Sequence, residues 1–588
     1  MTHGAASTSR FKLLLIKPSH YDDDGYVIQW LLSPIPANSL ACLYGIAREA
    51  ERNQALGPDV EFDIEAFDET NTRIRPEKLA RGILAADAGV AMLVGVQSNQ
   101  FPRALDIARR LRALGVQVCI GGFHVSGTLA MLPGIEANVQ AALDMGCSVF
   151  AGEAEEGRLE QVLRDAAAGA LKPVYNFMAD LPALETAPVP LLPARMVKRT
   201  FGANASFDAG RGCPYQCSFC TIINVQGRKS RRRSPDDVEA IVRANFAQGV
   251  HRFFITDDNF ARNRDWEPIF DRLADLREQG FKASMIIQVD TLCHRIPNFI
   301  EKARAAGVRR VFIGLENISP DNLMAAKKKQ NNITEYRKML LAWKAQKIIT
   351  YCGYITGFPS DTPERIARDI ATIQRELPVD VLEFFFLTPL PGSEDHQKLA
   401  AAGAWMDPDL NKYDLNHAVA RHPNMSIESW QGAYRDAWRA YYSDAHIATI
   451  MRRARALGNS PTKVMSLINW FKGAIEIENV HPLECGFLRR KHRRDRRPSL
   501  PMEPVWTFYP RRLWELVWLQ ARWLWLWLRI FALNRMVRWA PDGPRYMDEA
   551  ITPVDEHEEE RSMFQTDEAH AYVVDQHRME RIKAGATI

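Results

Sequence analysis

Cysteine is scarce in this chain, and most of it is scattered. The chain has 9 cysteines in 588 residues. Six of them stand singly: Cys42, Cys119, Cys147, Cys293, Cys352 and Cys485. Single cysteines do not build the disulfide framework of a secreted protein. We therefore expect these six to pack as small hydrophobic residues in a protein of the reducing cytoplasm.

Other signals are weak or missing. The formal net charge is only +4, too small to indicate a nucleic-acid partner, and we expect none. Residues 1–10 are polar and small, without the apolar core of a secretion signal, so we expect a disordered N-terminus there. Hydrophobic residues make up 46% of the chain, as in ordinary globular proteins. A chain of this length predicts three or four domains.

The three remaining cysteines lie within eight residues. Cys213, Cys217 and Cys220 have the spacing C-x3-C-x2-C, with no fourth cysteine or histidine nearby. Three thiolates on one loop can bind three corners of a cubane iron–sulfur cluster and leave the fourth iron open to another ligand. The alternatives are a chance grouping or a zinc loop, but a structural zinc site needs four nitrogen or sulfur ligands.

Residues 11–175 alternate short apolar runs with helical stretches. The pattern predicts strands at 11–16, 60–67, 90–96 and 116–120, and helices at 39–53, 76–86 and 102–114. This alternation indicates an α/β fold, a Rossmann-like, doubly wound parallel sheet. Ligands of such sheets bind beyond the carboxyl ends of the strands. Candidate ligand-binding residues at these ends are Ser98, Gly121, Gly122, Gly152 and Glu153.

A proline-rich linker, residues 176–195, separates this domain from a second α/β unit. In residues 196–410 the pattern predicts strands at 253–256, 283–289, 311–313, 351–355 and 381–387, with helices between them. Repeated strand–helix units predict a partial or full (β/α) barrel of the TIM type. Three motifs follow its strands and together suggest a ligand cradle: Thr256–Phe260, Gly314–Asn317 and Gly353–Pro359.

These motifs resemble those of the radical S-adenosylmethionine (SAM) superfamily, in particular its branch with a cobalamin-binding domain. The resemblance spans residues 11–403. Besides the three strand-end motifs, it rests on the Arg-Gly-Cys-Pro-Tyr-x-Cys-Ser-Phe-Cys loop and on Thr388–Ser393. In the first domain it rests on Gly121-Gly122-x-His124 and Gly152-Glu153-x-Glu155.

The resemblance implies a cofactor set and a role for each motif. Cys213, Cys217 and Cys220 would hold a 4Fe–4S cluster whose open iron chelates SAM, and reductive cleavage would give a 5′-deoxyadenosyl radical. SAM would be bound by the following residues, which match the family's motifs: Phe219, Asp257, Asp258, Gln288, Glu316, Gly353 and Gly357. The reductant would be a flavodoxin or a ferredoxin.

Cobalamin is implied by the resemblance and is not read from a motif. The Asp-x-His-x-x-Gly motif that supplies a histidine to cobalt is absent; His20 has the wrong spacing, and His124 is the other candidate. The favoured function is a B12-dependent methyltransferase that methylates an unactivated carbon. One alternative is a radical enzyme that uses SAM alone, for cyclisation or carbon–carbon coupling. A weaker one is a cobalamin or redox sensor without catalysis.

The C-terminal third predicts helices. Residues 411–505 contain helical patterns at 427–442, 447–457 and 461–475 and end in a basic run. Residues 506–540 form a Trp-rich amphipathic helix, in which Glu515, Arg522 and Arg529 share one narrow stripe. It predicts either peripheral contact with the inner face of the membrane and a lipid-like substrate, or a helix packed on the protein. We expect the tail, 541–588, to be poorly ordered.

Overall fold

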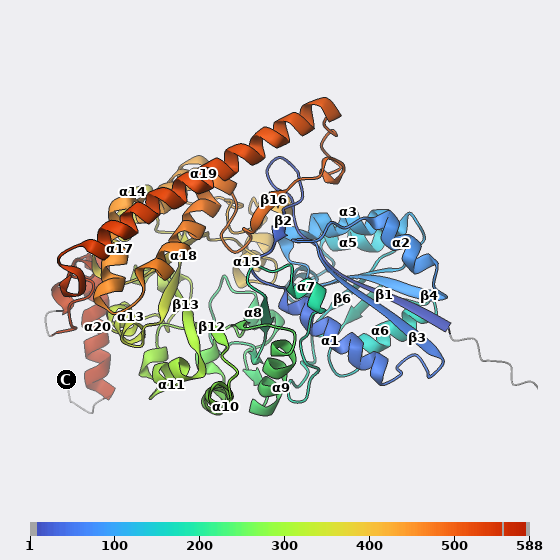
Figure 1. Cartoon of the computed structure of the whole chain (residues 1–588), viewed down its shortest axis with the longest axis horizontal. Coiled ribbons are helices and arrows are strands. Elements are labelled where there is room, and N and C mark those ends of the chain that lie inside the picture. Colours follow the sequence, from blue (N-terminus) through green and yellow to red (C-terminus); the bar gives the residue numbers. More distant parts are fainter. Residues whose placement is uncertain (1–8, 556–557, 584–588) are drawn as a thin grey trace, which may run out of the picture.

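The computed structural model describes residues 9–555 and 558–583, and three regions follow one another along the chain (Figure 1). A parallel-sheet domain comes first, a second parallel sheet follows, and a helical region packs on both. The disorder predicted for residues 1–10 concerns mainly residues 1–8, which lie outside the described residues. Ser9 and Arg10 belong to the first strand, so the sheet starts two residues before the predicted Phe11.

The first sheet has the order β3-β1-β4-β5-β6-β7, and all its strands are parallel. Its strands are β1 (Ser9–Lys17), β3 (Val60–Asp68), β4 (Ala88–Leu93), β5 (Val118–Gly121), β6 (Ser148–Ala151) and β7 (Val174–Asn176). Its helices are α1 (Asn38–Arg52), α2 (Pro76–Leu84), α3 (Phe101–Arg112), α4 (Phe123–Met131), α5 (Ala137–Asp144) and α6 (Arg158–Ala167).

Both faces of this sheet are covered, as a doubly wound fold requires. Because successive strand side chains point to opposite faces, Leu13 and Leu15 of β1 join the hydrophobic core beside α1 and α6. Leu14 and Ile16 join the core beside α2 and α3. The apolar run of β1 therefore fits a strand buried on both faces, and the predicted fold class is confirmed.

The second sheet is an open barrel of six parallel strands in the order β15-β14-β13-β12-β11-β8. They are β8 (Asn204–Phe207), β11 (Arg252–Ile255), β12 (Ser284–Val289), β13 (Val308–Glu316), β14 (Ile349–Thr356) and β15 (Val381–Phe386). The longer helices around it are α9 (Pro235–Phe246), α10 (Trp266–Glu278), α11 (Phe299–Ala306), α13 (Tyr336–Ala345), α14 (Pro363–Glu376) and α15 (Glu394–Ala401). The sequence pattern missed β8, which has only four residues.

The helical region packs beside the opening between the edge strands β8 and β15. It comprises α16 (Ile427–Tyr441), α17 (Asp444–Ala456), α18 (Pro461–Gly473) and α19 (Val505–Trp539). Trp470 of α18 stacks on Phe201, just before β8, with ring centroids 6.2 Å apart. Its neighbour Phe471 meets Tyr351 of β14 at 5.7 Å. The strand β16 (Phe487–Arg490) then pairs with β2 (Gln29–Leu32) of the first domain. This region therefore ties the two sheets together.

The expectation of a poorly ordered tail was wrong for the described part. The segment carries the helix α20 (Asp567–Lys583), and Met563 and Phe564 are buried. Arg337 of α13 donates to Glu558 at 2.5 Å. Two apolar side chains and an ion pair fix the segment on the barrel, although its composition is mostly polar.

Candidate active site

The three motif cysteines lie on one loop after the short strand β9 (Gly210–Arg211). Cys217 is buried, and Cys213 and Cys220 are half-buried. Burial and the neighbouring thiols raise the pKa of Cys213 to about 11 and that of Cys220 to about 12. Ionisation of Cys213 and Cys220 therefore needs added positive charge, which iron would supply.

The geometry distinguishes a cluster from a single ion. Within residues 9–555 and 558–583, no group of three His, Cys, Asp or Glu side chains is arranged to hold one metal ion. The thiol of Cys217 nevertheless lies close enough to Cys213 and Cys220 to contribute to the raised pKa of each. Three separated thiols on one loop fit the corners of a 4Fe–4S cluster better than a zinc site, which needs four converging ligands.

Backbone contacts hold the cysteine loop. Gly212 has φ +89°, and a Cβ there would lie 2.6 Å from the carbonyl oxygen of Lys229. The amide of Cys213 donates to the carbonyl of Gly227 at 3.2 Å, and the amide of Ser218 donates to Ala326 at 3.0 Å. These contacts explain why glycine precedes the first cysteine.

The two aspartates after β11 have different surroundings. Asp257 is buried and accepts hydrogen bonds from the amides of Ala209 at 2.7 Å and Gly210 at 2.8 Å. Gln288 donates to the backbone carbonyl of Asp257 at 3.2 Å. Asp258 instead lies near the cysteines, where burial raises its pKa to about 7. Asp257 therefore positions the backbone before the cysteine loop, and Asp258 is the better candidate to contact a ligand.

Two residues that the sequence analysis did not identify connect the cysteines to Glu316. Lys328 forms a buried ion pair with Glu316, whose φ of 62° lies in the left-handed region. Its ammonium lies 5.7 Å from the centre of the Phe219 ring. Gln330 donates to Sγ of Cys217 at 3.3 Å. Both residues belong to a polar run that follows α12 (Pro320–Ala325), and this run is the sequence feature that could have identified them.

Burial alone would lower the pKa of Lys328, but Glu316 and the thiols of Cys217 and Cys220 outweigh it and raise the pKa. The ammonium therefore stays charged between the proposed ribose site and the cysteines. Phe219 packs against Ile355 and Phe358 on the same side of the sheet. These contacts bring Phe219 and Glu316, two of the residues predicted to bind SAM, close to the same lysine.

The glycine motif at the end of β14 is closed by the helix α16, to which the sequence analysis gave no role in the site. Gly357 has φ +100°, and a Cβ there would lie 1.9 Å from the indole of Trp430 in α16. The amide of Gly357 donates to Asp361 at 2.7 Å. Gly353 lies farther down β14, where a Cβ would meet the rings of Phe312 and Phe385 at 3.1 and 3.2 Å. Both glycines therefore sit where side chains would displace neighbours.

The carboxyl edge of the first sheet holds the predicted cobalamin residues. His124 is fully buried and its Nδ1 lies 3.1 Å from Oγ of Ser98, so neither residue faces solvent. Gly122 has φ +145°, and a Cβ there would lie 2.1 Å from the amide nitrogen of Val96. The buried Oδ1 of Asn99 has no hydrogen-bond partner. A polar cofactor with amide groups fits this edge, because it could satisfy that oxygen.

The remaining predicted residues, Gly121, Gly152 and Glu153, lie at the ends of β5 and β6 on the same edge of the sheet. Gly121, at the end of β5, contacts Phe150 of β6, where a Cβ would lie 3.2 Å from the carbonyl oxygen. The amide of Gly152 donates to Oγ of Ser126 at 3.0 Å. Glu153 does not face open space: its carboxylate accepts from Arg211 at 2.6 Å and from Arg231 at 2.9 Å. Glu153 therefore joins the first domain to the cysteine loop through Arg211, which stands two positions before Cys213.

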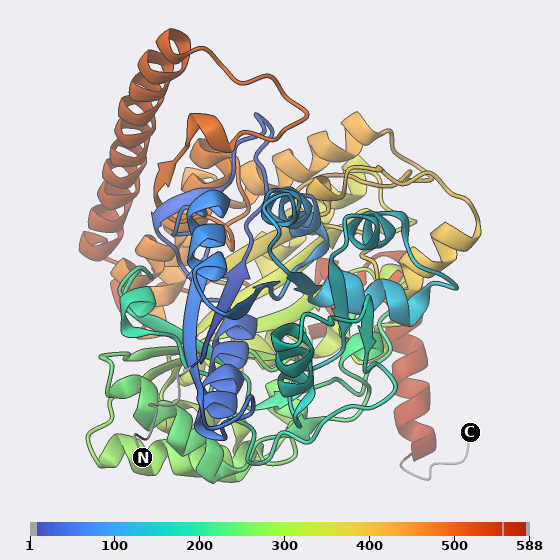
Figure 2. The ribbon, with the colours of Figure 1, turned by 90° about the vertical axis from the view of Figure 1, so that its right-hand side faces the viewer.

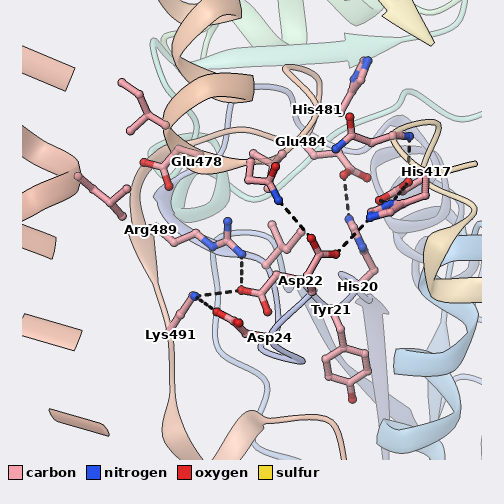
Figure 3. A pocket seen from close by; sticks show the side chains of 18 of the residues that line it. His20, Tyr21, Asp22, Asp24, His417, Glu478, His481, Glu484, Arg489 and Lys491 are labelled. Atoms are coloured by element: carbon pink, nitrogen blue, oxygen red, sulfur yellow. Dashed lines mark hydrogen bonds and ion pairs between the residues drawn. The ribbon is translucent and has the colours of Figure 1, made fainter. Parts of the chain in front are cut away.

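His20, the other histidine considered for cobalt, lines a polar cavity of about 330 Å³ (Figure 3). Its Nε2 lies 2.8 Å from Glu484 of the helical region. Burial alone would lower the pKa of His20, but Glu484 outweighs it and raises the pKa. A protonated imidazole cannot bind a metal, so the position does not favour His20 as a cobalt ligand.

Comparison with known proteins identifies the second domain. The Radical SAM superfamily model matches residues 209–373, which include the cysteine loop and the strands β11–β14. The 4Fe–4S cluster and SAM follow from this match.

Three curated relatives are methyltransferases or methylases. Two are from Chlorobaculum tepidum: bacteriochlorophyllide d C-8(2)-methyltransferase is 26% identical over 56% of this chain and 73% of its own length. The C-12(1)-methyltransferase is 29% identical over 53% of this chain and 66% of its own length. The hopanoid C-2 methylase of Rhodopseudomonas palustris is 26% identical over 50% of this chain and 55% of its own length.

Two solved structures share the fold beyond the barrel. OxsB with aqua-cobalamin and SAM bound has a TM-score of 0.52 at 12% identity, over 96% of this chain and 84% of its own. TsrM from Kitasatospora setae with cobalamin and a [4Fe-4S] cluster bound has a TM-score of 0.54 at 16% identity, over 74% of this chain and 89% of its own.

Proposed function

This chain is a radical SAM enzyme, and we propose that it is a cobalamin-dependent methyltransferase acting on an unactivated carbon. Its curated relatives support methyl transfer, since three carry that activity in their names. Another relative is described as a cobalamin-dependent radical SAM methyltransferase, TokK of Streptomyces tokunonensis, 26% identical over 29% of this chain. The alignments leave part of each relative unmatched, so the reaction and its substrate are proposals.

One observation carries the proposal: the cysteine loop and the carboxyl edge of the first sheet are joined. Arg211 Nη1 lies 2.6 Å from Glu153, Nη2 lies 2.7 Å from Glu155, and Nε lies 3.1 Å from Asp208. All four side chains are buried. This contact supports a placement of the two proposed cofactor sites close together, as transfer of a methyl group between two bound cofactors would require.

The cluster and cobalamin, when bound, would supply the electron that cleaves SAM and the methyl group that is transferred. Cys213, Cys217 and Cys220 would hold the cluster, and the glycine turns at 121–122 and 152 would let the backbone approach cobalamin. Lys328 keeps Glu316 oriented toward the SAM site. Phe219, with Ile355 and Phe358, provides an apolar wall that shields the reacting carbon from water.

We also propose a lipid-like substrate and peripheral contact with the inner face of the membrane. The helix α19 lies on the outside of the molecule (Figures 1 and 2). It is the one helix in the described residues that is long and apolar enough to cross a membrane, and 17% of its most apolar window is buried. The stripe of charges predicted from the sequence faces the protein: Glu515 pairs with Lys491, Arg522 donates to the carbonyl of Glu476, and Arg529 pairs with Asp444.

The opposite face of α19 is apolar and exposed. It presents large side chains over four turns: Leu513, Trp514, Val517, Trp518, Leu524, Trp525 and Leu528. Soluble monomers rarely leave so continuous an apolar surface in water. The basic run contributes less than expected, because Arg489, Lys491 and Arg497 are paired with aspartates. Contact with a bilayer would therefore depend mainly on the tryptophan face.

The reaction can be tested with SAM that carries a trideuterated methyl group. The reconstituted enzyme, cobalamin and a reducing system such as flavodoxin would be incubated with a lipid extract. We expect 5′-deoxyadenosine and S-adenosylhomocysteine to form in equal amounts, with a mass increase in one lipid. Formation of 5′-deoxyadenosine alone, with no label transferred, would overturn the methyltransferase proposal.

A further inference from the structure

The polar cavity beside His20 lies between the first domain and the helical region. Its walls come from the loop after β1, the segment after α15 that carries Asp414 and His417, the segment that follows α18, and α19. Figure 3 shows side chains from these segments pointing toward one another. A cavity of about 330 Å³ is at the lower end of the range for small-molecule sites, so it suits part of a ligand.

Two buried hydrogen-bond donors in this cavity have no partner. They are Nδ1 of His20 and Nε of Arg489, whose side chains are 4% exposed. The other nitrogen of His20 bonds Glu484, and the Nη2 of Arg489 bonds Asp22. An unpaired buried donor is costly, so an acceptor on a bound molecule would stabilise each of them.

The charge of the lining restricts what that molecule can be. Seven carboxylates line the cavity, against one arginine and one lysine: Asp22, Asp23, Asp24, Asp414, Glu478, Glu484 and Glu515. His20 and His417 add positive charge. Burial lowers the pKa of His417, but the hydrogen bonds that it donates to Asp23 and Asp414 outweigh burial and raise the pKa to about 10, and Glu484 raises the pKa of His20. Carboxylates still exceed cations, so an anionic ligand would be repelled.

Two of these carboxylates are partly exposed although each has a partner on the protein. The side chains of Asp23 and Asp24 are 62% and 63% exposed, and they pair with His417 and Lys491. They can accept hydrogen bonds, whereas His20 and Arg489 can donate them. Hydroxyl groups do both. We propose that this cavity binds the uncharged, polyhydroxylated head group of the substrate.

This inference rests on the proposed lipid-like substrate and names its polar end. Leu519, on the protein-facing side of α19, forms part of the cavity wall, and the adjacent Trp518 is exposed on the outward face. The cavity therefore lies directly behind the surface proposed to contact the membrane. On its inner side, His481 stands 3.7 Å from Glu383 of β15, so the cavity reaches the barrel.

Binding can be measured on the full-length, cobalamin-loaded enzyme with octyl β-D-glucoside, sodium octanoate and octylammonium chloride. All three would be used below their micelle concentrations in isothermal titration calorimetry. We expect one octyl glucoside per chain and binding at least about tenfold weaker for octanoate, which the carboxylates repel. The carboxylates attract octylammonium, but it cannot accept hydrogen bonds from His20 or Arg489, so we expect it also to bind more weakly than octyl glucoside. Octanoate or octylammonium binding as tightly as octyl glucoside would overturn the proposal.

Two variants test whether octyl glucoside binds in this cavity. Asp24→Ala removes an exposed acceptor, and Arg489→Lys keeps the charge but removes the unpaired Nε. Each should weaken octyl glucoside binding about tenfold. Asp236→Ala, on the remote helix α9, is the matched control and should bind as the parent does. Equal binding by Asp24→Ala, Arg489→Lys and the parent would contradict the proposal.

Two further experiments distinguish a head group in the cavity from a probe bound to the tryptophan face and from cobalamin in the cavity. Replacing Trp514, Trp518 and Trp525 together by Ser should leave octyl glucoside binding intact; its loss would mean that the probe binds the tryptophan face. Binding that occurs only in cobalamin-free enzyme would assign the cavity to the cofactor and overturn the inference. Failure of the methyltransferase proposal would appear separately, as missing methyl transfer in enzyme that still binds octyl glucoside.

Discussion

Arg211 Nη1 and Glu153 Oε2 lie 2.6 Å apart, and this buried contact joins the cysteine loop to the first domain. Removing one partner of a buried pair leaves an uncompensated charge, at a cost of about 3–5 kcal/mol. We expect Arg211→Met to lower the urea midpoint of unfolding and the iron content per chain. In the control Arg243→Met, which removes a half-buried pair with Glu239 on the surface of α9, the iron content should stay unchanged and the midpoint should fall less. Normal iron content in Arg211→Met would contradict this role.

Cys217→Ala should abolish formation of 5′-deoxyadenosine, because the cluster would lose one of its three protein ligands. Cys147→Ala provides the control, since Cys147 is buried in the core of the first domain and should leave SAM cleavage intact. The assay follows 5′-deoxyadenosine by chromatography after reduction with dithionite. SAM cleavage at the parent rate in Cys217→Ala would exclude the cluster assignment.

Lys328 holds Glu316 and lies near the cluster cysteines, whereas its neighbour Lys327 pairs with Glu394 at the surface. A hydrogen bond to a charged group contributes about 1.5–3 kcal/mol. We therefore expect Lys328→Met to raise the KM for SAM about tenfold or more and Lys327→Met to have little effect. SAM titrations that monitor cleavage would compare the two. Equal KM values for both variants would show that Lys328 does not support the SAM site.

Glu383 predicts a pH effect on stability. Burial raises its pKa to about 8, whereas its ordinary value is 4.5. The folded protein therefore binds this proton more tightly than the unfolded chain, so this contribution to stability is present at acidic pH and is lost as the pH rises from about 4.5 through 8. Glu383→Gln should lose less stability between pH 5.5 and 8.5 than the parent.

The measurement is the urea midpoint at the two pH values. Glu301→Gln, at an exposed position of α11, is the control and should behave as the parent does. An unchanged pH dependence in Glu383→Gln would show that Glu383 is ionised in the folded protein.

Substitutions on the outward and inward faces of α19 should differ in their effect on membrane binding. Replacing Trp514, Trp518 and Trp525 by Ser should reduce flotation with phosphatidylglycerol-containing vesicles at least about tenfold, because burial of large apolar side chains supplies the binding energy. Trp523→Phe is the matched control, since Trp523 faces inward and donates to Glu478 at 2.9 Å. Equal flotation of the triple variant and the parent would exclude membrane contact through this face. A change in oligomeric state in the triple variant would indicate that a second copy of the chain covers the face.

Local sequence patterns predicted much of the fold and of the site. Apolar runs located most strands of both sheets, and the cysteine spacing located the loop that the family match includes. β8 was missed because four residues carry no clear periodicity and its parallel partner, β11, lies far along the chain. Lys328, Gln330 and Trp430 were missed for a related reason: their contacts with Glu316, Cys217 and Gly357 depend on tertiary packing.

The sequence also identified the charged stripe of α19 but could not tell which way it faces. A helical pattern shows which residues share a face, whereas the direction depends on partners elsewhere. Here Asp444 and Lys491 turn the charges inward. Similarly, the sequence around Glu153 does not show that its carboxylate is paired with Arg211.

The central claim is that this radical SAM enzyme uses cobalamin. The most direct measurement is the amount of cobalamin bound per chain after anaerobic cluster reconstitution and cobalamin loading, together with the electron paramagnetic resonance spectrum of the cobalt. We predict about one cobalamin per chain and a spectrum without nitrogen coupling, since His20 is bonded to Glu484 and His124 is enclosed beside Ser98. A complete cluster that cleaves SAM in a protein that retains no cobalamin would contradict the account and favour a reaction that uses SAM alone.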